Sequence, residues 1–363
     1  KTNEDQIIGH FGLGFYSAFM VAEKVAIDTL SYKEGSKPVH WECEGGTEYD
    51  MGDGNKDTVG TTITLYLNED STEFANEFRA KEVIDKYCSF MPYEIYLDNE
   101  DDTEEKTQMI DKDELLDTDT IIETVKKEAK LEEQEDEDGN KKMVEVEPAT
   151  ERYKIAKRPV SLSDTTPLWT KHPNDCTDEE YKEFYRKVFH DYKEPLFWIH
   201  LNMDYPFNLK GILYFPKINI EFESAEGIIK LYNNQVFVAD NIKEVIPEFL
   251  MLLKGVIDCP DLPLNVSRSA LQNDGFVKKI SEYITKKVAD KLSGMCKTDK
   301  ESYEKYWDDI SPFIKFGCLK DDKFCDKMKD YILFKNLEGK YLTLPECLEE
   351  NKEKHENTVF YVK

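Results

Sequence analysis

A strongly acidic segment near the middle of the chain limits how the chain can fold. Residues 98–151 hold 22 acidic and 7 basic side chains and so carry 15 of the 27 net negative charges. Such a run buries too little apolar surface to offset the entropy lost on ordering. We therefore expect a solvated linker, in which residues 115–131 form at most a marginal helix. The alternative interpretation is an acidic surface for a basic partner.

The composition of the chain indicates a folded, multidomain protein. Its 363 residues are 40% hydrophobic and 12% aromatic, enough for two or three domains with real cores. The net charge of −27 argues against nucleic acid or an anionic membrane as the main partner. No apolar run approaches the roughly 18 residues of a membrane span, and the first residues show no signal-peptide pattern.

The cysteines and histidines give no sign of a metal site or a disulfide framework. The eight cysteines are scattered and form no C-x-x-C pair, and the six histidines show no H-E-x-x-H spacing. This pattern favours reduced thiols in the cytoplasm.

A glycine-rich turn stands at the start of the chain. Gly9, Gly12 and Gly14 precede apolar residues at helical spacing, and glycines that lead into a helix leave backbone N–H groups available to phosphate. A tight turn or a helix-packing role is the alternative. Only eight residues precede Gly9, so most walls of a nucleotide pocket would lie before residue 1. The first residue is also not Met. We therefore expect the chain to be a fragment.

Local patterns predict a mixed α and β architecture on both sides of the acidic segment. Alternating apolar residues predict antiparallel strands before it and further strands after it, at residues 25–32, 39–44, 61–67, 93–97, 211–215, 228–238 and 359–362. Residues 7–24 have the pattern of a loop followed by a helix. Apolar stripes predict further helices at residues 77–91, 178–192, 246–257, 276–295, 300–316, 321–333 and 345–352.

A second candidate site lies in residues 261–272, which read DLPLNVSRSALQ. Arg268 follows a proline-punctuated loop, with Asn265 and Gln272 as further hydrogen-bonding groups. An arginine is always charged and suits a γ-phosphate whose charge shifts during transfer. A salt bridge at a helix start is the alternative.

Five segments together resemble the heat-shock protein 90 family, in its bacterial branch. IGHFGLGFYSAF, VGTTITLYL, PLWTKHPND, LPLNVSR and the closing NTVFYVK occur in the order seen in that family. The resemblance implies an α+β and α/β multidomain fold. Its parts are a partial ATPase sandwich of the gyrase–histidine kinase–MutL type, a middle domain of the ribosomal protein S5 domain 2-like type, and a helical segment. The implied divisions are residues 1–98, the linker 99–158, the large middle subdomain 159–297, the helical connector 298–332, and an incomplete small subdomain 333–363.

The resemblance also implies roles for individual residues. Backbone groups that contact the ATP phosphates are Gly12, Leu13, Gly14 and Phe15, and Thr61 lies beneath the adenine. Arg268 reaches the γ-phosphate, with Gln272 as its polar partner and Asn265 just before it. Trp169 contacts clients and couples conformational changes, or else is a plain core or surface anchor.

The implied activity is that of an ATP-dependent chaperone. The cofactors are ATP and Mg²⁺, and the water-orienting glutamate and magnesium-binding asparagine lie before residue 1 in this family, so we expect no metal ligand here. The implied partners are unfolded clients and a second copy, paired through a C-terminal domain absent from this chain. The expected location is the cytoplasm. We expect the chain alone to have no measurable ATPase activity.

Two alternatives remain at this stage. The first is a MutL-like or gyrase-like ATPase that acts on DNA, but such proteins use a lysine on the second-domain loop and need basic surfaces. The second is an interaction fragment that works without nucleotide. The chain also departs from the family at Asn234 and Gln235, where arginines are common.

Overall fold

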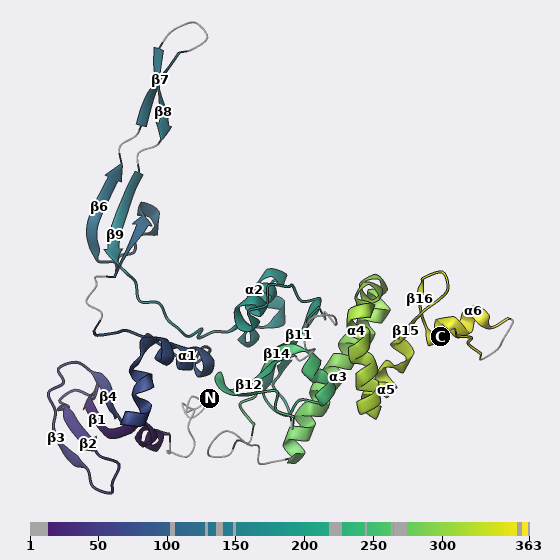
Figure 1. Ribbon diagram of the computed structural model, residues 1–363, viewed down its shortest axis with the longest axis horizontal. Helices are drawn as coiled ribbons and strands as arrows, with labels where there is room; N and C mark the ends of the chain where they lie inside the picture. Colours follow the sequence, from purple (N-terminus) through teal and green to yellow (C-terminus); the bar gives the residue numbers. More distant parts are fainter. Residues whose placement is uncertain are drawn as a thin grey trace. The chain divides into compact units, whose positions relative to one another are not determined.

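The computed structural model describes residues 14–101, 106–127, 130–135, 141–147, 150–217, 227–243, 245–262, 264, 274–353 and 358–361. The chain divides into two compact units (Figure 1). Unit 1 combines Lys1–Tyr93 with Ser163–Lys363, and unit 2 is Glu94–Leu162. The expected mixture of α and β structure is confirmed.

Unit 1 begins with an antiparallel four-stranded sheet, as predicted. Its strands occur in the order β3-β2-β1-β4, and they are β1 (Ala22–Leu30), β2 (Val39–Cys43), β3 (Asp50–Asp53) and β4 (Gly60–Leu67). The sequence did not predict β3, because Asp-Met-Gly-Asp lacks alternating apolar residues. A 3₁₀ turn, η2 (Phe15–Met20), stands where a helix was predicted.

A short helical segment follows this sheet. It consists of the 3₁₀ turn η3 (Glu69–Ala75) and helix α1 (Glu77–Tyr87). The Asn76 side chain caps α1 by accepting hydrogen bonds from the N–H groups of Phe78 and Arg79, at 3.0 and 3.2 Å. The helix ends at Tyr87 rather than at residue 91. The predicted strand at residues 93–97 is wrong, since these residues join no sheet.

Unit 2 overturns the expected marginal helix at residues 115–131. The segment instead contains a three-stranded antiparallel sheet and a hairpin. The sheet has the order β5-β9-β6, and its strands are β5 (Thr107–Asp111), β6 (Ile121–Lys127) and β9 (Thr150–Ala156). The hairpin joins β7 (Lys130–Glu135) to β8 (Lys141–Glu147). A 3₁₀ turn, η4 (Lys112–Glu114), follows β5.

Cross-strand pairing explains why this acidic segment folds instead of forming a solvated linker. Glu151 on β9 forms ion pairs with Lys112 of η4 and Lys126 of β6, at 2.9 and 3.1 Å, so basic groups from two other elements offset its charge. The side chains of Ile110 and Ile155 are buried. β-Branched residues in β6 also favour a strand over a helix.

The carboxylate of Asp119 predicts a pH dependence for unit 2. Arg158 donates to both of its oxygens, at 2.8 and 2.6 Å, and lowers the pKa of Asp119 to about 2. Because the folded pKa lies below the ordinary value, this contribution is present at neutral pH and is lost between about pH 4 and pH 2. In an acid titration followed by the methyl NMR signals of Ile110 and Ile155, Asp119→Asn should shift the unfolding midpoint. The matched control, Asp117→Asn, should not. Identical midpoints for wild type and Asp119→Asn would contradict the assignment.

The rest of unit 1 is built on a five-stranded sheet of order β10-β11-β14-β12-β13. The strands are β10 (Phe197–Met203), β11 (Leu209–Phe215), β12 (Ile229–Asn233), β13 (Val236–Asp240) and β14 (Lys254–Asp258). Only the pairing of β12 with β14 is parallel among these described strands. The strand predicted at residues 228–238 is a hairpin that turns at Asn234 and Gln235.

The helix predicted at residues 246–257 is wrong. The structure has a 3₁₀ turn, η7 (Glu248–Leu252), followed by β14. A short apolar run does not distinguish a buried strand from a helix. Packing against the neighbouring strand favours the strand here. The backbone of Gly255 lies so close to β11 that an added Cβ would be 2.8 Å from the carbonyl oxygen of Ile212.

The other predicted helices are confirmed with small shifts at their ends, except that the helix predicted at residues 321–333 ends at Met328. They are α2 (Asp178–Phe189), α3 (Asp274–Thr298), α4 (Lys300–Lys320), α5 (Asp322–Met328) and α6 (Leu344–Asn351). Short elements not predicted are η5 (Leu168–Thr170), η6 (Pro173–Asp175), η8 (Lys329–Tyr331), β15 (Leu333–Lys335) and β16 (Tyr341–Thr343). Residues 359–361 form no strand, and residue 362 lies outside the described residues.

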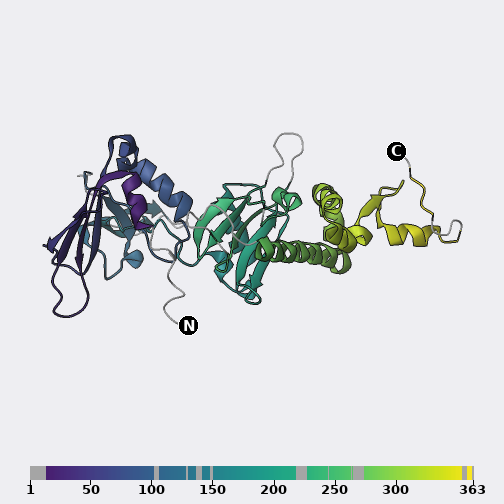
Figure 2. The ribbon, with the colours of Figure 1, turned by 90° about the horizontal axis from the view of Figure 1, so that it is seen from below.

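The five-stranded sheet is packed on both faces (Figure 2). Side chains alternate along each strand, so Ile212, Tyr214 and Val256 meet α2 on one face. Leu213 and Ile257 point to the other face, in a core shared with α3, α4 and α5. None of the described helices is long and apolar enough to cross a membrane.

Candidate functional site

Several of the predicted site residues lie outside the part of the chain that the structure describes. These are Gly12, Leu13, Asn265, Arg268 and Gln272. Their roles remain predictions. Gly14, Phe15, Thr61 and Trp169 are described.

Phe15 and Thr61 lie on the same face of the four-stranded sheet. The Phe15 ring packs edge-on against Trp41, with 5.7 Å between centroids. Trp41 pairs with Ile27, and Thr61 pairs with Thr29 two residues further along β1. Paired residues, and residues two apart on a strand, share a face. The structure therefore places Thr61 on the apolar face that Phe15 contacts.

This face is open at the positions expected to meet a nucleotide. A Cβ added to Gly14 would have no atom within 4 Å, so the backbone there is accessible. The hydroxyls of Thr61 and Thr29 lie 2.8 Å apart, and both threonines are near the end of their strands. Ile63, between Thr61 and Leu65 on the same face, is 55% exposed. Thr61 itself is exposed as well.

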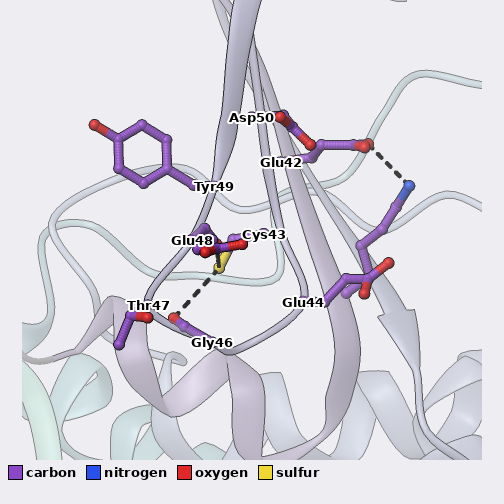
Figure 3. A pocket seen from close by; sticks show the side chains of 9 residues that line it. Glu42, Cys43, Glu44, Gly46, Thr47, Glu48, Tyr49 and Asp50 are labelled. Atoms are coloured by element: carbon purple, nitrogen blue, oxygen red, sulfur yellow. Dashed lines mark hydrogen bonds and ion pairs between the residues drawn. The ribbon is translucent and has the colours of Figure 1, made fainter.

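A separate pocket of about 830 Å³ lies at the turn between β2 and β3 (Figure 3). Its charged lining consists of Lys24, Glu42, Glu44, Glu48 and Asp50. The one lysine pairs with Glu42 at 2.8 Å and lowers the pKa of that carboxyl. Four carboxylates would repel a phosphate, so this pocket is unsuited to ATP. Among the described residues, no group of three or more His, Cys, Asp or Glu side chains is placed to hold a metal.

Trp169 is completely buried in the layer between α2 and the five-stranded sheet. Its ring lies 4.8 Å from Phe90, 5.2 Å from Tyr232 and 5.8 Å from Phe184, measured between centroids. The ring is 0% exposed, so its position in this structure is that of a core side chain. The role of Trp169 in client contact and conformational coupling stays a prediction.

The indole of Trp169 also makes one polar contact. Its Nε1–H donates to Oδ2 of Asp258 at 3.2 Å, and the backbone N–H of Gln235 donates to the same oxygen at 3.0 Å. Asp258 is 6% exposed, and within the described structure its Oδ1 atom has no hydrogen-bond partner. Burial raises the pKa of Asp258, because a charged carboxylate loses solvation there.

Asp258 is the last residue of β14 and begins the segment that leads to Arg268. The residues that follow Asp258 accept hydrogen bonds from two other parts of the chain. The Asn233 side chain donates to the carbonyl oxygens of Cys259 and Pro260, at 3.0 and 3.1 Å. The N–H of Asn208 donates to Asp261 at 2.7 Å. We call residues 258–262 the stem.

The sequence did not single out Asp258 or Asn233 as site residues. The signal available in the sequence was an acidic residue directly before a proline-rich loop. Asn233 begins the Asn-Asn-Gln turn between β12 and β13.

Comparison with known proteins identifies the family. The family model described as Hsp90 protein matches residues 73–363. The chain belongs to the Hsp90 family. Within this Hsp90-family chain, the match includes Trp169, the stem and the segment that carries Arg268.

Individual relatives agree along the whole chain. It is 42% identical over 365 aligned positions to a chaperone protein htpG of Bacteroides fragilis strain YCH46, covering 100% of this chain and 47% of the relative. A chaperone protein HtpG of Porphyromonas gingivalis strain ATCC 33277 is 40% identical over 97% of this chain and 46% of its own length. One from Desulfitobacterium hafniense strain Y51 is 31% identical over 98% of this chain and 49% of its own length. The chain thus spans about half the length of these relatives.

Proposed function

We propose that this chain is part of an ATP-dependent molecular chaperone. The observation that carries the proposal is the 42% identity, along the entire chain, to proteins named as HtpG chaperones. The proposed partners are unfolded or partly folded polypeptides and a second copy of the protein, and the proposed location is the cytoplasm. Nothing in the relatives favours a DNA-acting ATPase. The competing proposal is that the chain is an interaction module that binds partner proteins without nucleotide.

The two sheets of unit 1 fit different parts of this activity. We assign the four-stranded sheet to the ATPase sandwich and the five-stranded sheet, with α2 and α3, to the middle domain. Thr61 would support the adenine, and backbone groups from Gly12 to Phe15 would contact phosphates. When bound, ATP would supply the phosphoanhydride bond that is hydrolysed, and Mg²⁺ would neutralise the negative charge of the ATP phosphates. The resemblance places the magnesium ligand outside the residues of this chain. Arg268 would stabilise charge on the transferred phosphoryl group.

Nucleotide binding by the full-length protein tests the assignment of Gly14. Its φ and ψ of −58° and −37° are ordinary for any residue, and an added Cβ meets nothing. Gly14→Ala should therefore preserve the fold, while its methyl group should interfere with close approach of a phosphate. Calorimetric titration with MgATP should show about tenfold weaker binding, equal to about 1.4 kcal/mol.

Gly52→Ala on β3 is the matched control, because a Cβ there also has no neighbour within 4 Å. Its affinity should equal that of wild type. Equal affinities for Gly14→Ala and wild type would remove Gly14 from the site. No binding by wild type would instead favour the interaction module.

A further inference from the structure

Two cysteine thiols meet where helix α4 turns into helix α5. Cys318 lies near the end of α4, and Cys325 lies in the middle of α5. The Cys325 thiol forms a side-chain hydrogen bond with the thiol of Cys318. A disulfide forms only between cysteines whose sulfur atoms can approach to about 2.05 Å, which excludes pairs on distant parts of a backbone. This pair meets that requirement without a rearrangement of the helices.

The turn between the two helices fixes the backbone around the thiols. The N–H of Asp321 donates to the carbonyl oxygen of Gly317 at 2.9 Å and so ends α4. The Asp321 side chain caps α5, because it accepts a hydrogen bond from the N–H of Phe324 at 2.8 Å. The carbonyl oxygen of Asp321 accepts from the N–H of Cys325 at 2.9 Å. One residue therefore sets both the end of α4 and the start of α5.

The two helices also pack closely beside the thiols (Figure 1). A Cβ added to Gly317 would lie 2.6 Å from the ring of Phe324, so a larger residue would not fit between the helices there. The Phe324 ring is buried and packs against Phe249 and Phe313, with 4.8 and 6.0 Å between centroids. Gly317 and Phe324 each directly precede one of the cysteines. This close contact therefore holds the two thiols next to each other.

Both thiols are accessible to a small oxidant, but they differ in reactivity. Cys318 and Cys325 are partly exposed, whereas Cys43, Cys259 and Cys296 are buried. Burial, together with the hydrogen bond to Cys325, raises the pKa of Cys318 to about 12, so Cys318 keeps its proton at neutral pH. The thiolate is the form that attacks an oxidant. Cys318 is therefore suited to attack an oxidised neighbour rather than to react first.

We propose that Cys318 and Cys325 form a reversible disulfide when the protein meets hydrogen peroxide. In the first step the Cys325 thiolate attacks a peroxide oxygen. The S–O bond forms, the O–O bond breaks, and hydroxide leaves and combines with the proton that the thiol released. In the second step the Cys318 sulfur attacks the Cys325 sulfenic acid. The S–S bond forms, the S–O bond breaks, and hydroxide leaves with the Cys318 proton as water. The two sulfur atoms lose two electrons together, and the peroxide is reduced to two water molecules.

The disulfide would tether α5 to the end of α4. Disulfides in reducing compartments are usually transient and report the redox state. This modification site is independent of the proposed chaperone activity, since no step of it involves nucleotide or client.

Peptide mapping of the full-length protein after brief peroxide treatment tests the proposal directly. The reduced protein is treated under native conditions, blocked with N-ethylmaleimide and digested with trypsin. Trypsin cuts after Lys315, Lys320, Lys323 and Lys327, so the two cysteines fall in separate peptides, FGCLK and FCDK. The expected product is these two peptides joined, lighter than their sum by two hydrogen atoms. Dithiothreitol should separate them again.

Serine variants test the order of the steps. Cys318→Ser should leave a sulfenic acid at Cys325, which dimedone traps, whereas Cys325→Ser should leave Cys318 as a thiol. Cys347→Ser, at a partly exposed cysteine of α6, is the matched control and should give the joined peptide as wild type does. Absence of the joined peptide in wild type would overturn the proposal. Its appearance only after unfolding in urea would overturn it as well, because the folded structure would then not bring the thiols together.

Hydrogen–deuterium exchange supplies the second readout. A cross-link restricts local opening, so the amides of α5 should exchange about tenfold more slowly in the oxidised protein, and dithiothreitol should restore the original rate. Amides of α2, which packs on the opposite face of the five-stranded sheet, should stay within about twofold of their rate in the reduced protein. Peroxide should not slow exchange of α5 in Cys318→Ser. Faster exchange of α5 in the oxidised wild type would contradict the proposed tether.

Discussion

Replacement of Trp169 by alanine is expected to lower the free energy of unfolding of the five-stranded sheet by about 3–5 kcal/mol. The ring is 0% exposed and packs against Phe90, Phe184 and Tyr232, so its removal leaves a large cavity. It also removes the indole N–H from Asp258, whose other oxygen already lacks a partner in the described structure. The bond from the N–H of Gln235 to Asp258 remains, but the loss of one hydrogen bond to a buried carboxyl adds to the cost.

A urea series followed by hydrogen exchange in α2 and β11 measures this loss. Trp169→Phe separates the two causes, because it retains most of the apolar contact but removes the hydrogen bond. Its loss should be smaller than that of alanine. The control Tyr192→Ala, at a side chain 90% exposed, should stay within about 0.5 kcal/mol of wild type. A similarly small change for Trp169→Ala would contradict the buried role of this ring.

Replacement of Arg268 by alanine is expected to abolish most ATP turnover by the full-length protein. Arginines that stabilise a transferred phosphoryl group contribute about 10³–10⁵ in kcat in the best-studied cases. We expect a loss of at least about 100-fold in kcat with little change in KM, because the interaction strengthens as charge develops. Arg186→Ala, at an arginine on α2 that pairs with Glu179, is the matched control and should retain wild-type turnover.

The turnover rate of a lysine variant separates the charge of Arg268 from the geometry of its side chain. Arg268→Lys keeps the charge but loses the planar fork of donors, so it should recover only part of the rate. Equal kcat for Arg268→Ala and wild type would exclude this residue from the reaction. A raised KM with unchanged kcat would assign it to ground-state binding instead.

The helices that the sequence predicted correctly carry their signals locally. In α2, the Thr177 side chain accepts from the N–H of Glu180 at 3.3 Å, while the Glu180 side chain accepts from the N–H of Thr177 at 2.8 Å. This capping box and the apolar stripe that includes Tyr181 and Tyr185 are both visible within 12 residues. Because the cap and the apolar stripe lie within the helix segment itself, the sequence pattern was sufficient to predict α2.

The errors arose where distant residues decide the structure. Unit 2 is built from contacts between distant residues: strand β9 pairs with β5, and Lys112 reaches Glu151, which lies 39 residues away. Composition alone does not reveal such pairing. The strand β14 replaces a predicted helix because its neighbours are β11 and β12. In both cases tertiary contacts override local preference.

The candidate site shows the same division. Phe15, Thr61 and Trp169 were predicted from motifs, and the structure places Phe15 and Thr61 on one face of a sheet. Asp258 was not predicted, because its contact with Trp169 joins residues 89 positions apart. The polar role of Asn233 is equally non-local, since its partners lie on the stem.

The proposal that this chain is part of an ATP-driven chaperone is tested most directly by client refolding. The yield of a chemically denatured model enzyme should be measured with the full-length protein, with and without ATP, for wild type and Arg268→Ala. We expect ATP to raise the yield with wild type, and we expect Arg268→Ala to give the yield seen without ATP. Equal yields for wild type with and without ATP would contradict it.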